Sequence, residues 1–152
     1  MKFEDALSRR TMLRTAGMGL AVAALPSAAW ATAADVEAEF KKVFAGKTAK
    51  DGKIKLDLPS IAENGLVVPL NFEVESPMTA DNFVKSVHIF SEGNPNPLVA
   101  AFHFTPMIPK AAAQIRIRLA ETQNVVAYAE MSNGEVYVAK KEVKVTIGGC
   151  GG

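Results

Sequence analysis

The sequence predicts an all-β protein, an immunoglobulin-like antiparallel β-sandwich with a short N-terminal helix and a flexible C-terminal Gly-Cys-Gly arm. Its 152 residues suffice for one domain. About seven short segments with alternating apolar and polar residues follow one another between residues 54 and 147. Turn-forming residues separate these segments, and no helical periodicity lies between them. Strands in succession without intervening helices are typical of a sandwich, and a closed barrel is the structural alternative.

The N-terminal residues 1–31 have the pattern of a cleaved export signal. A charged stretch, residues 1–14, precedes the uncharged apolar run Thr15–Leu25, and the small residues of Ala29–Ala31 offer a cleavage site. The apolar run has about half of the roughly 20 residues that span a bilayer, so we expect no membrane anchor. Within the charged stretch, Ser8–Arg14 resembles a twin-arginine export signal. That resemblance implies a periplasmic protein that is exported folded and can cross with a bound cofactor or partner.

Residues 32–147 are predicted to form the folded domain, which begins with a helix. Asp35 is predicted to cap this helix, and Gly46 is predicted to stop it. The apolar residues that recur at helical spacing are Val36, Phe40, Val43 and Phe44. A polar stretch, Gly46–Lys53, is then expected to link the helix to the first strand.

The strands are predicted from period-two alternation and from the turn residues between them. Asn133-Gly134 between two alternating runs predicts a tight hairpin. In the last strand, Val143, Val145 and Ile147 are expected to point into the core. The predicted strands are Ile54–Leu58, Leu66–Val74, Phe83–Phe90, Leu98–Thr105, Gln114–Ala120, Val125–Met131 and Val136–Ile147.

The charge balance argues against a nucleic acid or an acidic membrane surface as the main partner. Without residues 1–31 the chain has 13 basic and 14 acidic residues, and its net charge is near −1. Basic residues on the predicted strands are interpreted as solvated side chains that discourage strand association, although they could also draw an anion to the tail or mark a partner surface. They are Arg116, Arg118, Lys140, Lys141 and Lys144.

No catalytic motif is visible in the sequence, so we expect a protein that is not itself an enzyme. It lacks a phosphate-binding loop, a nucleophile elbow and any cysteine pair with metal-ligand spacing. His88 and His103 are the only histidines. They are interpreted as partly solvated strand residues, because no further ligands accompany them, and no metal or cofactor is expected.

The chain ends in Gly148-Gly149-Cys150-Gly151-Gly152, and Cys150 is its only cysteine. An exported chain with one cysteine cannot form an internal disulfide, so the thiol is unmodified, modified or paired with another molecule. Ordering a glycine-rich tail would cost much backbone entropy for little apolar burial. The segment 148–152 is therefore predicted to be a flexible arm, on which the glycines supply reach and clearance and Cys150 carries the chemistry. No adjacent base activates the thiol, so activation is expected from a partner.

This terminus on an exported all-β chain resembles the SoxY family, the sulfur carriers of the thiosulfate-oxidising Sox system. The resemblance implies that Cys150 is the covalent attachment site for sulfur intermediates and that the chain forms a heterodimer with SoxZ, which lacks its own export signal. It further implies three partner enzymes. The haem enzyme SoxAX couples thiosulfate to the thiol, the hydrolase SoxB releases sulfate, and the molybdenum-haem dehydrogenase SoxCD, where present, oxidises the remaining sulfur.

Two other classes of function are compatible with the terminus. The first is a ubiquitin-like sulfur carrier activated at the carboxylate of Gly152, which export disfavours because adenylation requires cytoplasmic ATP. The second is a secreted β-sandwich interaction protein that dimerises through a disulfide between Cys150 residues. A sulfur adduct that depends on substrate would distinguish a carrier from such a dimer.

Overall fold

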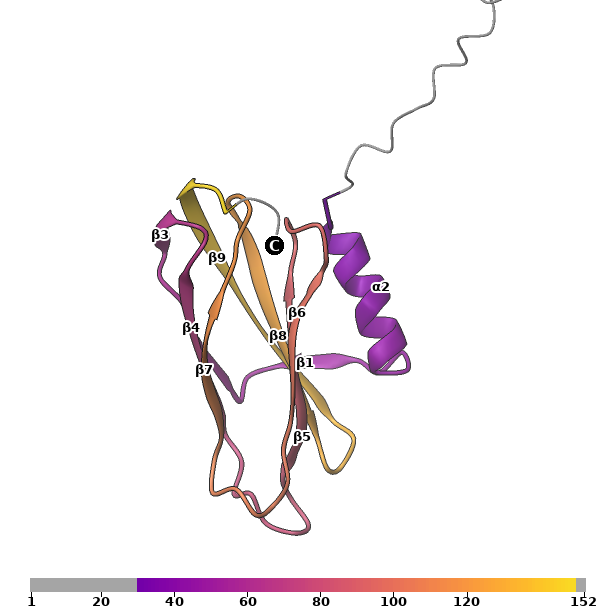
Figure 1. The fold of residues 1–152 in the computed structure, drawn as a ribbon. Coiled ribbons are helices and arrows are strands. Elements are labelled where there is room, and N and C mark those ends of the chain that lie inside the picture. Colours follow the sequence, from indigo (N-terminus) through magenta and orange to yellow (C-terminus); the bar gives the residue numbers. More distant parts are fainter. Residues whose placement is uncertain (1–29, 150–152) are drawn as a thin grey trace, which may run out of the picture.

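Two β-sheets pack face to face, and one helix covers the outer face of the larger sheet (Figure 1). The structure is a computed structural model that describes residues 30–149. The predicted export signal and the residues 150–152 of the predicted arm lie outside these described residues, apart from Trp30 and Ala31 at the signal's end. Within the described part of the chain, no helix is long and apolar enough to cross a membrane.

The larger sheet has the order β1-β9-β8-β5-β6, with β3 also paired to β9, and the smaller sheet has the order β2-β4-β7. This arrangement confirms the predicted all-β sandwich. The larger sheet consists of β1 (Ala49–Asp51), β3 (Ile61–Asn64), β5 (Val84–Ser91), β6 (Leu98–His103), β8 (Gln123–Met131) and β9 (Val136–Ile147). The smaller sheet consists of β2 (Ile54–Asp57), β4 (Val68–Val74) and β7 (Ala111–Ile117).

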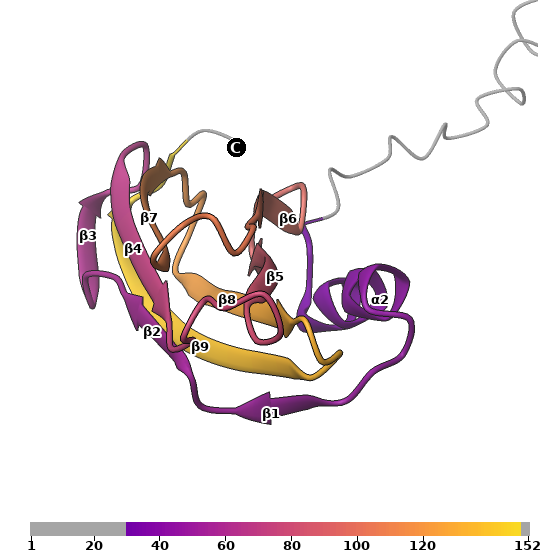
Figure 2. The same cartoon turned by 90° about the horizontal axis from the view of Figure 1, so that it is seen from below.

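Two short strands, β1 and β3, were not predicted, and both pair with β9 in parallel. Between them the chain crosses to the smaller sheet and forms β2, so this part of the chain changes sheets twice (Figure 2). β1 lies in the polar stretch that was expected to be a linker, and β3 has a single buried residue, Ala62. Strands this short and this exposed carry little period-two signal, so only their pairing with the long β9 identifies them.

The N-cap of the helix α2 (Ala33–Val43) is Thr32 and not Asp35 as predicted. Thr32 accepts a hydrogen bond from the Asp35 backbone N–H, and the Asp35 carboxylate accepts one from the Thr32 backbone N–H at 2.7 Å. Together they form a capping box, in which the acidic residue occupies the third helical position. Hydrogen bonds from the Thr32 backbone N–H and from its hydroxyl to the Asp35 carboxylate lower the pKa of Asp35. Either residue type can cap a helix, so the sequence alone did not select between them.

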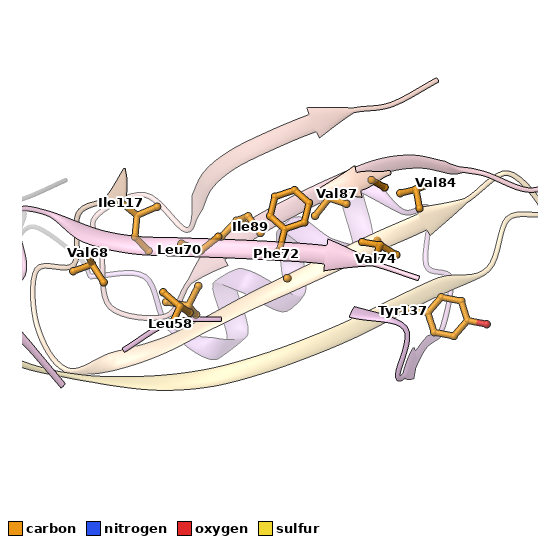
Figure 3. Close-up of a cluster of buried hydrophobic side chains, with 14 of the residues drawn as sticks. Leu58, Val68, Leu70, Phe72, Val74, Val84, Val87, Ile89, Ile117 and Tyr137 are labelled. Atoms are coloured by element: carbon orange, nitrogen blue, oxygen red, sulfur yellow. The ribbon is translucent and has the colours of Figure 1, made fainter. Parts of the chain in front are cut away.

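The main core lies between the two sheets, where β4 alternates buried and more exposed residues as predicted (Figure 3). Val87 and Ile89 of β5 are fully buried against it. Burial falls along the end of β9, from Val143 at 0% exposed to Ile147 at 67% exposed. The prediction that Ile147 points into the core is therefore wrong, because this end of β9 pairs with the mostly exposed β3 and extends past the core.

Candidate functional site at the C-terminal end of β9

Three loops converge where β9 ends: the β3–β4, β5–β6 and β7–β8 loops lie at the same end of the sandwich (Figure 1). The alternating strand directions place these loops together, since β9 and β5 run towards this end and β8 and β6 run away from it. The chain passes through this group of loops as Gly148 and Gly149 before it reaches Cys150. We call the docked segment Gly148–Gly149 the arm root.

Backbone hydrogen bonds hold the arm root against two of the loops. The Gly65 N–H donates to the Ile147 carbonyl at 2.8 Å, and the Leu119 N–H donates to the Gly65 carbonyl at 2.8 Å. The Gly149 N–H in turn donates to the Leu119 carbonyl at 3.0 Å, and Gly149 is buried. The first two glycines of the predicted arm are thus part of the folded body in this structure.

Glycine is required at these positions because the backbones approach too closely for a Cβ atom. A Cβ on Gly65 would lie 2.1 Å from the Leu119 carbonyl oxygen, and one on Gly148 would lie 2.1 Å from the Ala120 carbonyl oxygen. A Cβ on Gly149 would lie 2.8 Å from the Gly65 carbonyl oxygen. The sequence predicted that Gly148 and Gly149 supply flexibility and clearance to the arm. In the structure their missing side chains provide the clearance that close backbone packing requires.

Asn94 fixes the β7–β8 loop against which the arm root docks. Its buried amide donates to the Arg118 carbonyl at 2.8 Å and accepts from the Ala120 N–H at 3.0 Å. The buried Gln123 donates to the same Asn94 oxygen at 3.0 Å and accepts from the Gly93 N–H at 2.9 Å. The sequence did not single out Asn94, because a buried asparagine and a solvated turn asparagine look the same in a Gly/Pro-rich loop.

Exposed apolar side chains surround the arm root. Leu66 is 44% exposed and Val67 is 56% exposed in the β3–β4 loop, and Ile147 at the end of β9 is 67% exposed. The Leu66 N–H is held by the Asn64 side chain at 2.9 Å, which orders this loop. We call Leu66, Val67 and Ile147 the apolar rim.

The basic residues singled out in the sequence lie on β7, on β9 and at the start of the β7–β8 loop. Arg116 and Arg118 on β7 and just after it are exposed, in agreement with the predicted solvated face. Lys140 is exposed and donates to the Glu92 carboxylate at 2.7 Å. Lys144 is exposed and lies opposite Ile61 of β3, so it occupies a paired part of β9.

The two histidines lie side by side on β5 and β6, and their ring centroids are 6.0 Å apart. His103 is exposed as predicted, but His88 is only 9% exposed, so its predicted partial solvation is wrong. Helix α2 covers this face of the sheet, and the Phe44 ring meets the His88 ring edge-on at 5.2 Å. Among residues 30–149, no group of three or more His, Cys, Asp or Glu residues is placed to hold a metal ion.

The burial of His88 predicts that stability falls in mild acid. Burial, reinforced by the nearby His103 and opposed by Glu130, lowers the pKa of His88 below its usual 6.5. The unfolded chain therefore takes up a proton at a higher pH than the folded chain, and stability is lost as the pH falls from about 6.5 towards the folded-state pKa.

Urea unfolding at about pH 7.5 and about pH 5.5 checks this expectation. The native chain should be less stable at the lower pH, and His88→Leu should reduce the difference. His103→Gln, at the exposed neighbour, should preserve most of it. An unchanged difference in His88→Leu would assign the pH dependence to other groups.

Comparison with known proteins identifies the family. The chain matches the family model of the sulfur oxidation protein SoxY over residues 40–150. The solved structure of the sulfur carrier protein SoxY from Chlorobium limicola f thiosulfatophilum is 31% identical, with a TM-score of 0.65 over 76% of this chain and 100% of that chain. No match was found among curated protein sequences.

Other solved structures share the fold at low identity. A superoxide reductase (neelaredoxin) from Ignicoccus hospitalis is 19% identical, with a TM-score of 0.55 over 76% of this chain and 94% of that chain. A putative superoxide reductase from Thermotoga maritima is 12% identical, with a TM-score of 0.56 over 65% of this chain and 93% of that chain. These two similarities concern the fold alone.

The sandwich fold and the match that extends to residue 150 define the class of this protein, an all-β sulfur carrier of sulfur oxidation. The chain belongs to the SoxY family. Of the residues predicted from sequence to form the site, the structure places Gly148 and Gly149 in a docked root, and Cys150, Gly151 and Gly152 lie outside the described residues.

Proposed function

We propose that the protein is a periplasmic carrier on which Cys150 covalently holds thiosulfate-derived sulfur, and that it works as a heterodimer with SoxZ. Membership of the SoxY family supports the carrier role. The single observation that carries the assignment to Cys150 is its place as the only cysteine, one residue beyond a root that is docked at the convergence of three loops. The paired arginines Arg9 and Arg10 support folded export, which would allow a partner without a signal to cross as well.

Two steps describe the proposed chemistry. In the first, the Cys150 sulfur bonds to the outer sulfur of thiosulfate, the thiol proton goes to solvent, and two electrons pass to a haem enzyme such as SoxAX. In the second, water attacks the sulfonate sulfur in the active site of a hydrolase such as SoxB. The bond between the sulfonate sulfur and the adjacent sulfane sulfur breaks, sulfate leaves, and a persulfide remains on Cys150. A molybdenum-haem dehydrogenase such as SoxCD would oxidise that persulfide further.

The protein itself is proposed to be a carrier and not an enzyme, which needs no cofactor or metal of its own. The residues next to Cys150 in sequence are glycines, which offer no side chain to activate the thiol or to stabilise a transition state. The partners must therefore supply the electron acceptor, the activated water and the groups that bind the reacting sulfur.

The short reach of the thiol beyond the arm root explains why partner enzymes must dock close to it. Cys150 directly follows Gly149, and an extended chain advances at most about 3.6 Å per residue, so the thiol stays within several ångströms of the root. An enzyme that receives Cys150 in its active site therefore covers the surface around the root. The apolar rim offers the exposed apolar side chains that a docked partner would bury.

Substitution of the apolar rim is expected to weaken loading of the thiol without unfolding the domain. Ile147→Ser should lower kcat/KM for thiosulfate coupling about tenfold, since losing one well-buried apolar contact at an interface costs on the order of 1–2 kcal/mol. The melting temperature should change little because Ile147 is 67% exposed. Met107→Ser is the matched control, because Met107 is 92% exposed in the β6–β7 loop at the opposite end of the sandwich (Figure 1). Equal losses in the two variants would argue against docking at the rim.

Isolation of the protein from the periplasm tests the proposed function. Cells that produce the full chain are grown with and without thiosulfate, the periplasm is prepared without reductant, and intact mass is measured. We expect a mature chain that has lost its signal, an adduct that appears with thiosulfate and is removed by dithiothreitol, and a co-purifying SoxZ chain. A constitutive disulfide dimer with no substrate-dependent adduct would instead support the interaction protein.

A further inference from the structure

We propose that Gly65, in the β3–β4 loop, is a positioning residue for the carrier arm. Its backbone docks the arm root, and its lack of a side chain leaves room for that docking. The proposal rests on the proposed function in one respect, because it takes Cys150 to be the group that the root presents to partner enzymes. It assigns a role to a residue some 80 positions away in sequence from the segment that it controls.

Gly65 lies at the centre of the contacts that hold the root. It donates to the Ile147 carbonyl just before the root and accepts from Leu119, whose own carbonyl accepts from Gly149. It is also the residue nearest to the position of a Gly149 Cβ, with the Gly65 carbonyl oxygen 2.8 Å from that position. The end of β9, the β3–β4 loop and the β7–β8 loop are thereby joined through one residue.

An alanine at position 65 cannot be accommodated in this arrangement. Its Cβ would lie 2.1 Å from the Leu119 carbonyl oxygen and 2.8 Å from the Gly149 nitrogen, both of which are backbone atoms. Backbone atoms in a hydrogen-bonded loop cannot move aside as the end of a flexible side chain can. Because Gly65 does not have a positive φ, alanine is otherwise allowed there, and its main effect is the clash with the Leu119 carbonyl and with the Gly149 nitrogen of the root.

A docked root shortens the tether between the folded body and the thiol from three residues, 148–150, to Cys150 alone. The effective concentration of a tethered group falls with about the −3/2 power of the length of a flexible linker, so a tether of one residue in place of three raises it. Docking also fixes the point and direction in which the chain leaves the body. Both effects keep the thiol close to the apolar rim, where a partner enzyme is proposed to bind.

Amide hydrogen exchange at Gly149, measured by NMR on the full mature chain, tests the proposal. In the native chain the Gly149 amide should exchange at least about tenfold more slowly than in an unstructured peptide, because it is buried and hydrogen-bonded. In Gly65→Ala this protection should be lost while the amides of the central strands stay protected. Gly52→Ala is the matched control. The Gly52 backbone has a φ of +107°, which strains any residue with a side chain, and an added Cβ there would have no atom within 4 Å. The substitution therefore perturbs the fold without touching the root.

A second variant keeps the test decisive if Gly65→Ala does not fold. Gly149→Ala meets the Gly65 carbonyl and the Leu66 nitrogen from the side of the arm, and the rest of the domain is left unchanged. Its arm root should undock, so the amides of Gly65 and Leu119 should exchange faster than in Gly52→Ala. An unprotected Gly149 amide in the native chain would overturn the proposal, as would undiminished protection of the root in a folded Gly65→Ala or Gly149→Ala.

These measurements need no sulfur compound and no partner, so their outcome is separate from that of the adduct experiment. A protected Gly149 amide in a chain that never carries sulfur would leave the docking intact and refute the carrier function. An adduct on Cys150 in a chain whose Gly149 amide is unprotected would leave the carrier function intact and refute the role of Gly65.

Discussion

Cys150→Ser is expected to carry no sulfur adduct under any growth condition, while the folded domain remains unchanged. Serine is nearly isosteric with cysteine but cannot form the bond to thiosulfate sulfur, so loading should be lost completely. The melting temperature should stay within the error of the measurement, because residue 150 follows the last docked residue, Gly149. Intact-mass spectrometry of protein from cells given thiosulfate, together with thermal unfolding, checks both expectations.

Deletion of Gly151 and Gly152 is the companion experiment, because it separates two kinds of carrier. It removes the terminus that a ubiquitin-like protein would activate and leaves the Cys150 thiol in place. The truncated chain should still acquire a sulfur adduct that dithiothreitol removes. Persistence of the adduct in Cys150→Ser, or sulfur transfer that disappears with the two glycines alone, would contradict the assignment to the thiol.

Asn94→Ala is expected to cause the largest loss of stability among the substitutions near the site, about 2–4 kcal/mol. It leaves the Arg118 carbonyl, the Ala120 N–H and one donor of Gln123 without their partner in a buried region. Each buried polar group that loses its partner costs about 1–3 kcal/mol, and water entering the space recovers part of this. Chemical denaturation of the native chain and the variant measures the difference.

The same substitution should also loosen the arm root, since Asn94 holds the loop whose Leu119 carbonyl accepts from Gly149. Asn96→Ala provides a matched control, with the same amino acid removed from the same loop at an exposed position. It should change the free energy of unfolding by less than about 0.5 kcal/mol. Equal effects at positions 94 and 96 would show that the buried hydrogen bonds are not the cause.

Strands were predicted well where one face is buried and poorly where neither face is. β4 buries alternate residues and β8 buries most of its residues, so the apolar pattern of both strands is strong in the sequence. β1 and β3 are short and exposed and exist through their pairing with β9. β7 was predicted to begin at Gln114 but begins at Ala111, because three successive alanines show no contrast between an inner and an outer face.

The histidine prediction failed for a related reason. His88 and Ser86 lie on the outer face of β5, and polar residues on one face of a strand normally indicate a face in contact with solvent. In this protein α2 packs on that face through Phe40 and Phe44, which contact the sheet near Tyr128. The apolar stripe of the helix was visible in the sequence, but the sheet face that it covers was not.

The sequence by itself determined the all-β class, the core of the longer strands and the terminal cysteine with its glycines, and this terminus by itself indicated the SoxY family. Each of these depends on local composition or on a short periodic pattern. Only the tertiary structure decided which part of GGCGG is docked, because the docking contacts join Gly149 to Leu119 and Ile147 to Gly65. Those residues are far apart along the chain, and they meet because alternating strand directions bring three loops to one end of the sandwich. In the sequence, Gly65 does not differ from the other turn glycines. The backbone packed against it in the structure shows why a side chain is excluded there.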